Sequence, residues 1–335
     1  MQRARTERGR RKFPLLRKRV SDYWLFPALL AATVGAGFET ARLLTRHGWD
    51  GKDWKSWIAG WVAFWGFVVA IRFIEKVRPF EPAWNRRDDQ LANDIVLPLV
   101  SSLVFLAVPF ATWYANTLTW AVSWAASRVP LLHVLHIWPT HWPAILSIPI
   151  GIIVLDLGPH LAHRWSHTTK LFWRFHSVHH SAPRLCVINT ARAHPGNLVI
   201  IILCGVPIPT LLGVPAEVVV WYSVLTTYAG FLTHANIDMP CGIFSYLINT
   251  PELHRWHHSR IQKETDTNFG EVTVLWDHVF GSYFHPKRRP PRDVGVDFPV
   301  STKIIQQLIQ PMTPAGHRPG DFAISTLPPG DAGIA

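Results

Sequence analysis

Histidine is concentrated in two short stretches of this chain. Six of its 18 histidines fall within HLAHRWSHTTKLFWRFHSVHH, residues 160–180, and three more within TPELHRWHHSR, residues 250–260. Residues three or four apart in a helix share a face, so these stretches predict three helical segments that present imidazoles to one space. Neutral imidazole binds iron, zinc, copper and nickel. The histidines at this spacing are His163, His167, His176, His179, His180, His254, His257 and His258.

Eight imidazoles exceed the four ligands of one tetrahedral zinc ion, so the pattern indicates two metal ions in a shared pocket. The alternative is a set of exposed histidines on amphipathic helices. One pair at helical spacing would favour that alternative, whereas three matched clusters favour a metal site. The cysteines Cys186, Cys204 and Cys241 form no CxxC pair, and they predict neither a disulfide framework nor a thiolate site.

The composition is typical of a membrane protein. Charged residues make up 16% of the chain, against roughly 25% in globular domains. The chain also has 17 tryptophans, a residue enriched at membrane interfaces. Apolar runs near the length needed to cross a bilayer predict spans at 24–44, 57–74, 95–113 and 143–157, followed by a helical hairpin at 198–212 and 216–231.

Lys and Arg residues predict the orientation of these spans. Residues 1–20 carry nine of them, the loop at 75–92 is also rich in them, and the stretch 114–142 has only Arg128. By the positive-inside rule, the N-terminus, both histidine clusters and the C-terminus lie in the cytoplasm. The basic arm directly precedes an apolar span, which favours a juxtamembrane segment over nucleic-acid binding.

Four segments of the chain resemble the fatty acid hydroxylase/sterol desaturase superfamily: DLGPHLAHRWSH, LFWRFHSVHHS, NTPELHRWHHSR and NFGEVTVLWDHVFGSYF. The family signature HxxxH, HxxHH and HxxHH is met by the eight histidines above, within residues 145–286. The resemblance implies an all-α polytopic membrane bundle with a dimetal site at its cytoplasmic face. It also implies two non-haem Fe ions, which zinc can replace in a purified sample, and O2 as co-substrate.

Further site residues are expected from the same resemblance. His234 occupies a position where relatives often carry a histidine, and it is a candidate ninth ligand. His194 matches a recurrent His-Pro element with an expected role beside the ligands, although relatives often have an acid where this chain has Asn197. Asp156 is a candidate acceptor for the free ring nitrogen of a ligand histidine. His160 is expected to be structural.

The domain organisation expected is a basic arm at 1–20, membrane spans at 21–142, the enzyme domain at 143–286 and a Pro/Gly-rich tail at 287–335. The sequence shows no reductase, haem or ferredoxin module. A separate electron donor is therefore expected, such as a cytochrome b5-like protein, a ferredoxin or a reductase. The lipid substrate, an acyl, sterol-like or alkylglycerol lipid, is expected to enter from the bilayer.

Several functions stay open at this point. Hydroxylation, desaturation and ether cleavage share the first hydrogen abstraction, and the spacing of the histidines does not distinguish them. A membrane metal-transport or metal-binding protein is the main alternative, but it would place ligands along the spans rather than at their ends. A zinc hydrolase would need a nearby carboxylate base, for which Glu252 and Glu271 are candidates.

Overall fold

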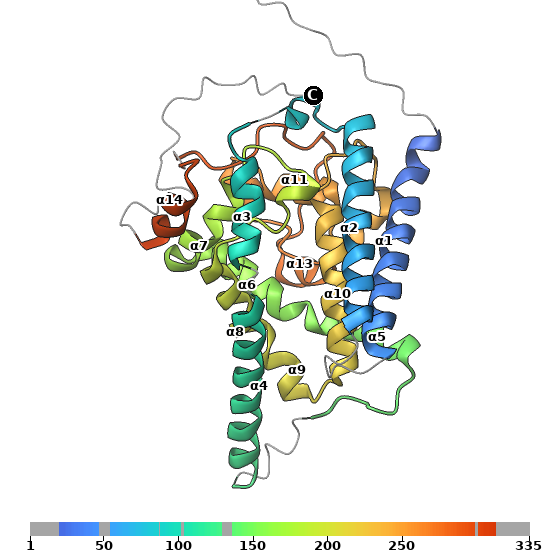
Figure 1. The fold of residues 1–335 in the computed structure, drawn as a ribbon, viewed down its shortest axis with the longest axis vertical. Helices are drawn as coiled ribbons and strands as arrows, with labels where there is room; N and C mark the ends of the chain where they lie inside the picture. Colours follow the sequence, from blue (N-terminus) through green and yellow to red (C-terminus); the bar gives the residue numbers. More distant parts are fainter. Residues whose placement is uncertain are drawn as a thin grey trace, which may run out of the picture.

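The protein is a bundle of helices (Figure 1). The computed structural model describes residues 20–46, 54–86, 88–101, 104–128, 136–298 and 301–312. Within these ranges there is no β-strand, and only isolated bridges pair extended residues. The prediction of an all-α fold is confirmed.

The helices are α1 (Val20–Arg46), α2 (Trp54–Val77), η1 (Pro82–Asn85), α3 (Leu91–Ser101), α4 (Val104–Ala126), α5 (Ala144–Leu155), α6 (Leu157–Thr168), α7 (Lys170–His180), η3 (Val187–Asn189), α8 (Pro195–Gly205), α9 (Pro207–Leu212), α10 (Ala216–Thr233), η4 (Gly242–Tyr246), α11 (Pro251–His257), α12 (Gln262–Thr265), α13 (Leu275–Phe280), α14 (Ile304–Ile309) and η5 (Gln310–Met312).

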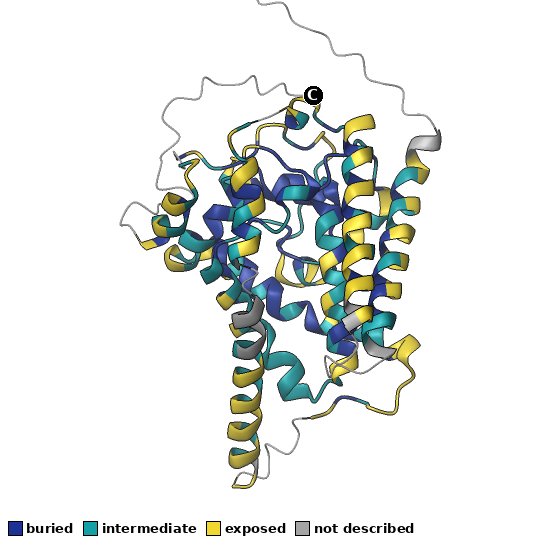
Figure 2. Ribbon diagram, viewed as in Figure 1, coloured by how far each residue is buried: buried dark blue, intermediate teal, exposed yellow. Residues whose placement is uncertain are grey.

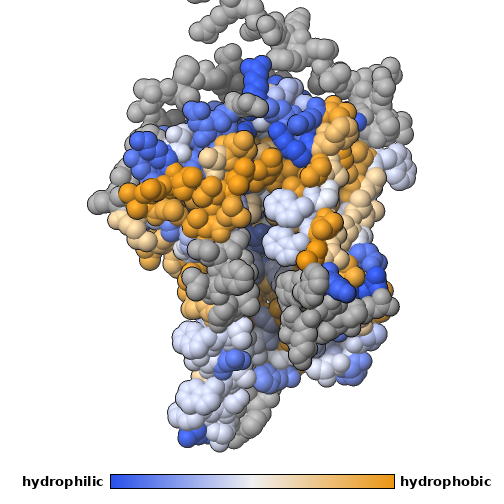
Figure 3. Space-filling model, viewed as in Figure 1, coloured by the Kyte–Doolittle hydropathy of each residue, from blue (hydrophilic) through white to orange (hydrophobic). Residues whose placement is uncertain are grey.

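Four stretches of the described residues are long and apolar enough to cross a membrane: Tyr23–Leu44, Ile58–Val77, Ala144–Thr168 and Pro195–Leu212. Large apolar side chains on α1 and α2, such as Trp24, Val62 and Phe73, are exposed. Figure 2 shows exposed residues along α1, α2 and α4, and Figure 3 shows hydrophobic residues gathered below a hydrophilic end. Apolar surface of this extent is unusual on a water-soluble monomer, and it fits a polytopic membrane protein.

Two predicted spans need comment. Of the run at 95–113, α3 covers the residues up to Ser101 and α4 those from Val104, while residues 102–103 lie outside the described ranges. The run at 143–157 continues past Asp156 into α6, so the first histidine cluster prolongs a membrane-length stretch. The predicted hairpin is confirmed as α8 and α9 followed by α10, where Gly213 ends α9 with a φ of 69° that favours glycine.

Helices α1, α2 and α10 share a hydrophobic core that extends to the segment after His234. Phe26, Val68, Ile71 and Leu232 belong to one buried cluster. The core continues directly from the end of α10 into the segment after His234. Packing of the N-terminal helices therefore fixes the end of α10 and, with it, the ring of His234.

The α2 helix is joined to the loops of the histidine region by one buried carboxylate. Glu75 is fully buried, and its Oε1 accepts hydrogen bonds from the backbone N–H groups of Val187, at 2.7 Å, and Asn236, at 2.9 Å. Its Oε2 accepts from Arg72, at 2.7 Å. A buried carboxylate needs such partners to remain charged, so these bonds fix the two loops against α2.

The α6 helix, which carries His163 and His167, lies unusually close to α8. A Cβ atom added at Gly158 would lie 2.6 Å from the carbonyl oxygen of Cys204 and 2.7 Å from the Cα atom of Gly205. Both of those are backbone atoms, so neither can rotate away. Glycine at position 158 therefore allows the backbones of α6 and α8 to pack this closely.

The helix ends lie at two opposite ends of the bundle. In Figure 1 the C-terminal ends of α2 and α10, the start of α3 and the short helix α11 lie toward one end of the bundle, while the turn between α9 and α10 lies toward the other. This arrangement agrees with the expectation that the histidine clusters share a face with the loop at 75–92.

Candidate metal centre

The nine histidines predicted as ligands meet in two groups within the described part of the chain. In each group, one ring nitrogen from every residue lies within 4.8 Å of the others. The first group is His163, His167, His176, His180 and His257, and the second is His179, His234, His254 and His258. His234, the candidate ninth ligand, falls in the second group.

Helical geometry divides the histidine clusters between the two groups. On α7, His176 and His180 are four residues apart and face the first group, whereas His179 faces the second. The cluster on α11 is divided in the same way, because His257 belongs to the first group and His254 and His258 belong to the second. The N-caps Thr169 and Thr250 accept hydrogen bonds from the backbone N–H groups of Phe172 and Leu253 and fix where these short helices begin.

Six of the nine rings have Nδ1 within 3.4 Å of an oxygen acceptor. The acceptors are the carbonyl oxygens of Phe269 for His163 (2.9 Å), Arg192 for His179 (3.0 Å) and Thr267 for His257 (2.8 Å), and the side-chain oxygens of Asp266 for His167 (3.2 Å), Asn197 for His176 (3.2 Å) and Asn189 for His234 (3.4 Å). A ring that donates from Nδ1 keeps its lone pair on Nε2. These contacts therefore leave Nε2 as the ring nitrogen available to a metal ion in all six rings.

The spacing of the Nε2 atoms fits a cation in each group. Nε2 of His180 lies 3.1 Å from Nε2 of both His167 and His257, and Nε2 of His254 lies 2.8 Å from that of His234. His167, His257 and His234 already donate from Nδ1, so their Nε2 lone pairs point at a neighbouring nitrogen. Two nitrogens bonded to one ion at about 2.1 Å and at a right angle lie about 3.0 Å apart. The convergence of these lone pairs is what metal ligands require.

Two residues expected beside the ligands act elsewhere. Asp156 accepts hydrogen bonds from the backbone N–H groups of Val272 (3.2 Å) and Thr273 (3.0 Å) and from the Tyr222 hydroxyl (3.2 Å). Its oxygens are thus used by the 272–273 segment, and it contacts no candidate ligand among the described residues. The hydrogen bonds of Asp156 in the structure therefore go to backbone N–H groups and to a tyrosine hydroxyl, whereas the sequence suggested a ligand ring as its partner.

His194 also differs from its expected place. Its Nδ1 accepts from the N–H of Gly196 at the start of α8, at 2.9 Å, and its Nε2 lies 3.0 Å from the Leu308 carbonyl oxygen. It is a helix cap rather than a partner of a ligand ring. The partner of His176 is instead Asn197, whose Oδ1 lies 3.2 Å from Nδ1 of that ring. His160 lies outside both groups, stacked on Phe280 with ring centroids 5.5 Å apart, as expected of a structural residue.

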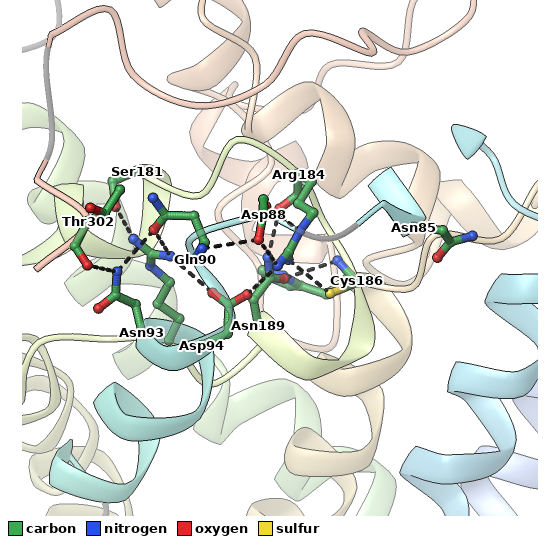
Figure 4. A network of polar contacts seen from close by, with 12 residues as sticks. Asn85, Asp88, Gln90, Asn93, Asp94, Ser181, Arg184, Cys186, Asn189 and Thr302 are labelled. Atoms are coloured by element: carbon green, nitrogen blue, oxygen red, sulfur yellow. Dashed lines mark hydrogen bonds and ion pairs between the residues drawn. The ribbon is translucent and has the colours of Figure 1, made fainter. Parts of the chain in front are cut away.

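A buried polar network lies beside the end of α7, the helix that carries His176, His179 and His180. Figure 4 shows Asp94, Ser181 and Arg184 within this network. Arg192 is fully buried and donates to Asp94 at 3.0 Å, Ser181 at 2.8 Å and Gln307 at 3.1 Å, while its own carbonyl accepts from His179. Arg184 pairs with the same Asp94 at 2.8 Å. The network joins α3 and α14 to the chain after α7, and it positions the acceptor that orients the His179 ring.

A cavity of about 150 Å³ lies beside both histidine groups. Besides histidines, its lining contains Ser166, Thr190, Ala193, Asn197, Ile201, Gly230, Thr233, Asn249, Gly270 and Glu271. Ile201 and Gly230 come from the apolar helices α8 and α10, so the cavity is bounded in part by helices of the bundle. Burial raises the pKa of Glu271 to about 7.

Acid is expected to destabilise the metal-free protein. Burial lowers the pKa of His179 from its usual 6.5 to about 4. Burial also lowers the pKa values of His254 and His258 well below the usual histidine value. The unfolded chain therefore binds more protons than the folded chain between about pH 6.5 and 4, and stability present above this window is lost as the pH falls through it. Thermal unfolding of chelator-treated protein should occur at a lower temperature at pH 5 than at pH 7.5. Equal unfolding temperatures would contradict the burial of neutral rings.

Comparison with known proteins agrees with this site. Residues 148–282 match the family model described as fatty acid hydroxylase. The chain is 35% identical over 257 residues to the ornithine lipid hydroxylase OlsE of Rhizobium tropici, a match that covers 77% of this chain and 76% of that protein. It is 24% identical over 162 residues to alkylglycerol monooxygenase of Homo sapiens, covering 46% and 36% of the two chains.

A third relative is methylsterol monooxygenase 1-3 of Arabidopsis thaliana, 23% identical over 152 residues, covering 43% of this chain and 50% of that protein. No solved structure matches the chain significantly. The chain belongs to the fatty acid hydroxylase/sterol desaturase superfamily.

Proposed function

We propose that this protein is a membrane-bound lipid oxygenase that uses O2 and two iron ions to hydroxylate a C–H bond of a membrane lipid. The observation that carries the proposal is the pair of histidine groups, in which six rings have their Nδ1 atoms directed to oxygen acceptors. Relatives named as lipid hydroxylases and monooxygenases support the same class of reaction. The net reaction takes one oxygen atom into the lipid and reduces the other to water with two electrons and two protons.

The iron ions, when bound, supply O2 activation and the oxidising power that a C–H bond requires. The chain supplies the ligands, namely His163, His167, His176, His180 and His257 for one ion and His179, His234, His254 and His258 for the other. The acceptors of the Nδ1 protons hold each ring in the neutral tautomer that binds metal. The cavity beside both groups holds the reacting part of the lipid close to the ligands and limits the access of water.

The proposal also covers the lipid and the electrons. The lipid reaches the cavity from the bilayer past α8 and α10, which line it in part, and we propose that a separate protein delivers the electrons at the cytoplasmic face. A desaturase and an ether-cleaving oxygenase share the first hydrogen abstraction and are distinguished by their products. A metal transporter is disfavoured because eight of the nine candidate ligands are buried and most are hydrogen-bonded in place, and because the described residues offer no series of such sites along a span.

Mass spectrometry of total lipids from cells with and without this chain tests the proposal. Hydroxylation shifts a lipid by +16 mass units, desaturation shifts it by −2, and ether cleavage removes an alkyl chain. The expected result is a +16 product that is absent from cells expressing His257→Ala at the same protein level. Unchanged lipids in cells that contain iron-loaded protein would favour a metal-binding role instead.

A further inference from the structure

The short helix α14 is fixed to the bundle by polar groups on its inner side. Gln307 is fully buried, and its Oε1 accepts a hydrogen bond from the guanidinium group of Arg192, at 3.1 Å. The carbonyl oxygen of Leu308 lies 3.0 Å from Nε2 of His194. Arg192 also provides the carbonyl oxygen that orients the His179 ring, at 3.0 Å. The inner side of α14 therefore contacts the residue that positions a candidate metal ligand.

The other side of α14 is apolar and exposed. Ile305, Ile309 and Met312 are 72%, 52% and 69% exposed, and these three residues form the outer face of α14. Their spacing along α14 and its continuation η5 places them on one side, opposite the buried Gln307. A surface helix of a water-soluble protein turns its apolar stripe to the core and its polar side chains to water. Helix α14 has the reverse arrangement, which fits an apolar environment outside the bundle.

The outer face of α14 continues an exposed apolar stripe on α3. Leu91, Ile95 and Leu99 recur every four residues on that helix, and all three are exposed. The two elements are joined, because the Asn93 side chain donates a hydrogen bond to the carbonyl oxygen of Thr302, at 2.8 Å. Figure 3 shows hydrophobic residues in a band at the level of α14, α7 and α3, directly below the hydrophilic end. The outer face of α14 thus lies where the apolar surface of the bundle meets the polar one.

This border matches the lipid–water interface of a membrane. Helices that lie in this interface bury their apolar face at the boundary of headgroups and acyl chains, while their lysines reach the headgroups. Lys303 is exposed and directly precedes α14, and Lys170 is exposed at the start of α7. Charged and apolar residues are therefore placed around α14 as an interfacial helix requires.

We propose that α14 lies in the lipid–water interface of the membrane that the chain crosses, with its outer face in contact with lipid, and that from this position Gln307 holds Arg192 and, through it, the His179 ring. Contact with lipid removes apolar side chains from water and stabilises the packed position of α14. The bilayer thereby helps to keep the second histidine group together. The role of Gln307 rests on the proposed function, because it concerns a metal ion, whereas the contact of α14 with lipid does not.

Quenching of a fluorescent label by brominated lipid tests the contact with the membrane. The whole chain with Cys204→Ser and Ile309→Cys is labelled with bimane and reconstituted into phosphatidylcholine vesicles, with and without bromine on the acyl chains. Cys186 and Cys241 are buried, so the label goes to position 309. We expect the brominated lipid to quench this label strongly.

Two further labelled positions calibrate the quenching. Val62→Cys is exposed within the membrane-length stretch of α2 and should be quenched, whereas Ala83→Cys is exposed on η1 beyond the end of α2 and should not be. A label at position 309 that is quenched no more than the label at position 83 would overturn the inference. Disulfide crosslinking of Ile309→Cys between two chains would also overturn it, since a second copy would then cover the outer face.

Metal binding tests the role of Gln307. In Gln307→Ala, which removes the acceptor of Arg192, the affinity for one of the two metal ions should fall about tenfold to a hundredfold, as is usual when a residue that supports a ligand is lost. Gln307→Glu keeps an acceptor and should restore most of this affinity. Competition with a chelator, on protein in phosphatidylcholine vesicles, measures both.

Gln306→Ala is the matched control, because Gln306 is the exposed neighbour of the same residue type. It should bind metal as wild type does. Unchanged affinity in Gln307→Ala would overturn the role of Gln307, and so would an equal loss of both ions, which would indicate general destabilisation. If wild type binds no metal, the proposed function fails, while quenching at position 309 still decides whether α14 contacts lipid.

Discussion

Replacing His179 by alanine should reduce the metal content of the protein from two ions per chain to about one. His179 belongs to the group of four, which would be left with three rings, whereas the group of five keeps all of its ligands. Lipid oxidation should fall by at least about a hundredfold, because loss even of a residue that only orients a ligand costs about ten- to a hundredfold in such sites. Metal content is measured by inductively coupled plasma mass spectrometry and activity by product formation.

His141→Ala is the control for this change, since His141 is exposed and lies outside both groups. It should retain two metal ions and full activity. Equal metal content in His179→Ala and wild type would contradict the assignment of the second group. Loss of both ions in His179→Ala would instead show that the two groups fill cooperatively.

Replacing Arg192 by alanine should lower the free energy of unfolding by about 3–5 kcal/mol, the range found when one partner of a buried ion pair is removed. The change leaves Asp94 without one of its two arginine partners, and it removes the donors to Ser181 and Gln307. Its backbone carbonyl also orients His179, so metal affinity should fall as well. Thermal unfolding in detergent, with metal content measured on the same samples, checks both effects.

Arg260→Ala is the matched control. Arg260 also pairs with two aspartates, Asp293 and Asp297, but all three side chains are substantially exposed. Exposed ion pairs contribute at most about 1 kcal/mol, so this variant should unfold close to the wild-type temperature. Similar destabilisation by both variants would mean that the burial of the Arg192 network adds nothing to stability.

The histidine pattern predicted most of the candidate site because the information is local. Residues i, i+3 and i+4 of one helix necessarily share a face, and three such clusters needed only to be brought together by the fold. Spacing does not reveal that His179 and His180, adjacent in sequence, belong to different groups. That division depends on how α7 is rotated against α6 and α11, which is set by tertiary packing.

The partners of the ligand rings could not be predicted in the same way. Three of them are backbone carbonyls, which any residue could provide, and the others are single Asn or Asp side chains such as Asn189 and Asn197. Asp156 shows the opposite problem, because its position suggested a ligand partner while free N–H groups at 272–273 bind it. The apolar runs predicted the membrane helices well, although the run at 143–157 did not reveal that the membrane-length stretch continues past Asp156 into α6.

The most direct test of the central claim is the source of the oxygen in the lipid product. Purified protein loaded with two iron ions is supplied with reductant, a total membrane-lipid extract and ¹⁸O2 in ordinary water, and the lipids are analysed by mass spectrometry. The account predicts a product heavier by 18 mass units, and no labelled product when the label is carried by the water instead. Label that enters from water, or no product from iron-loaded protein, would contradict the assignment of this protein as a lipid oxygenase.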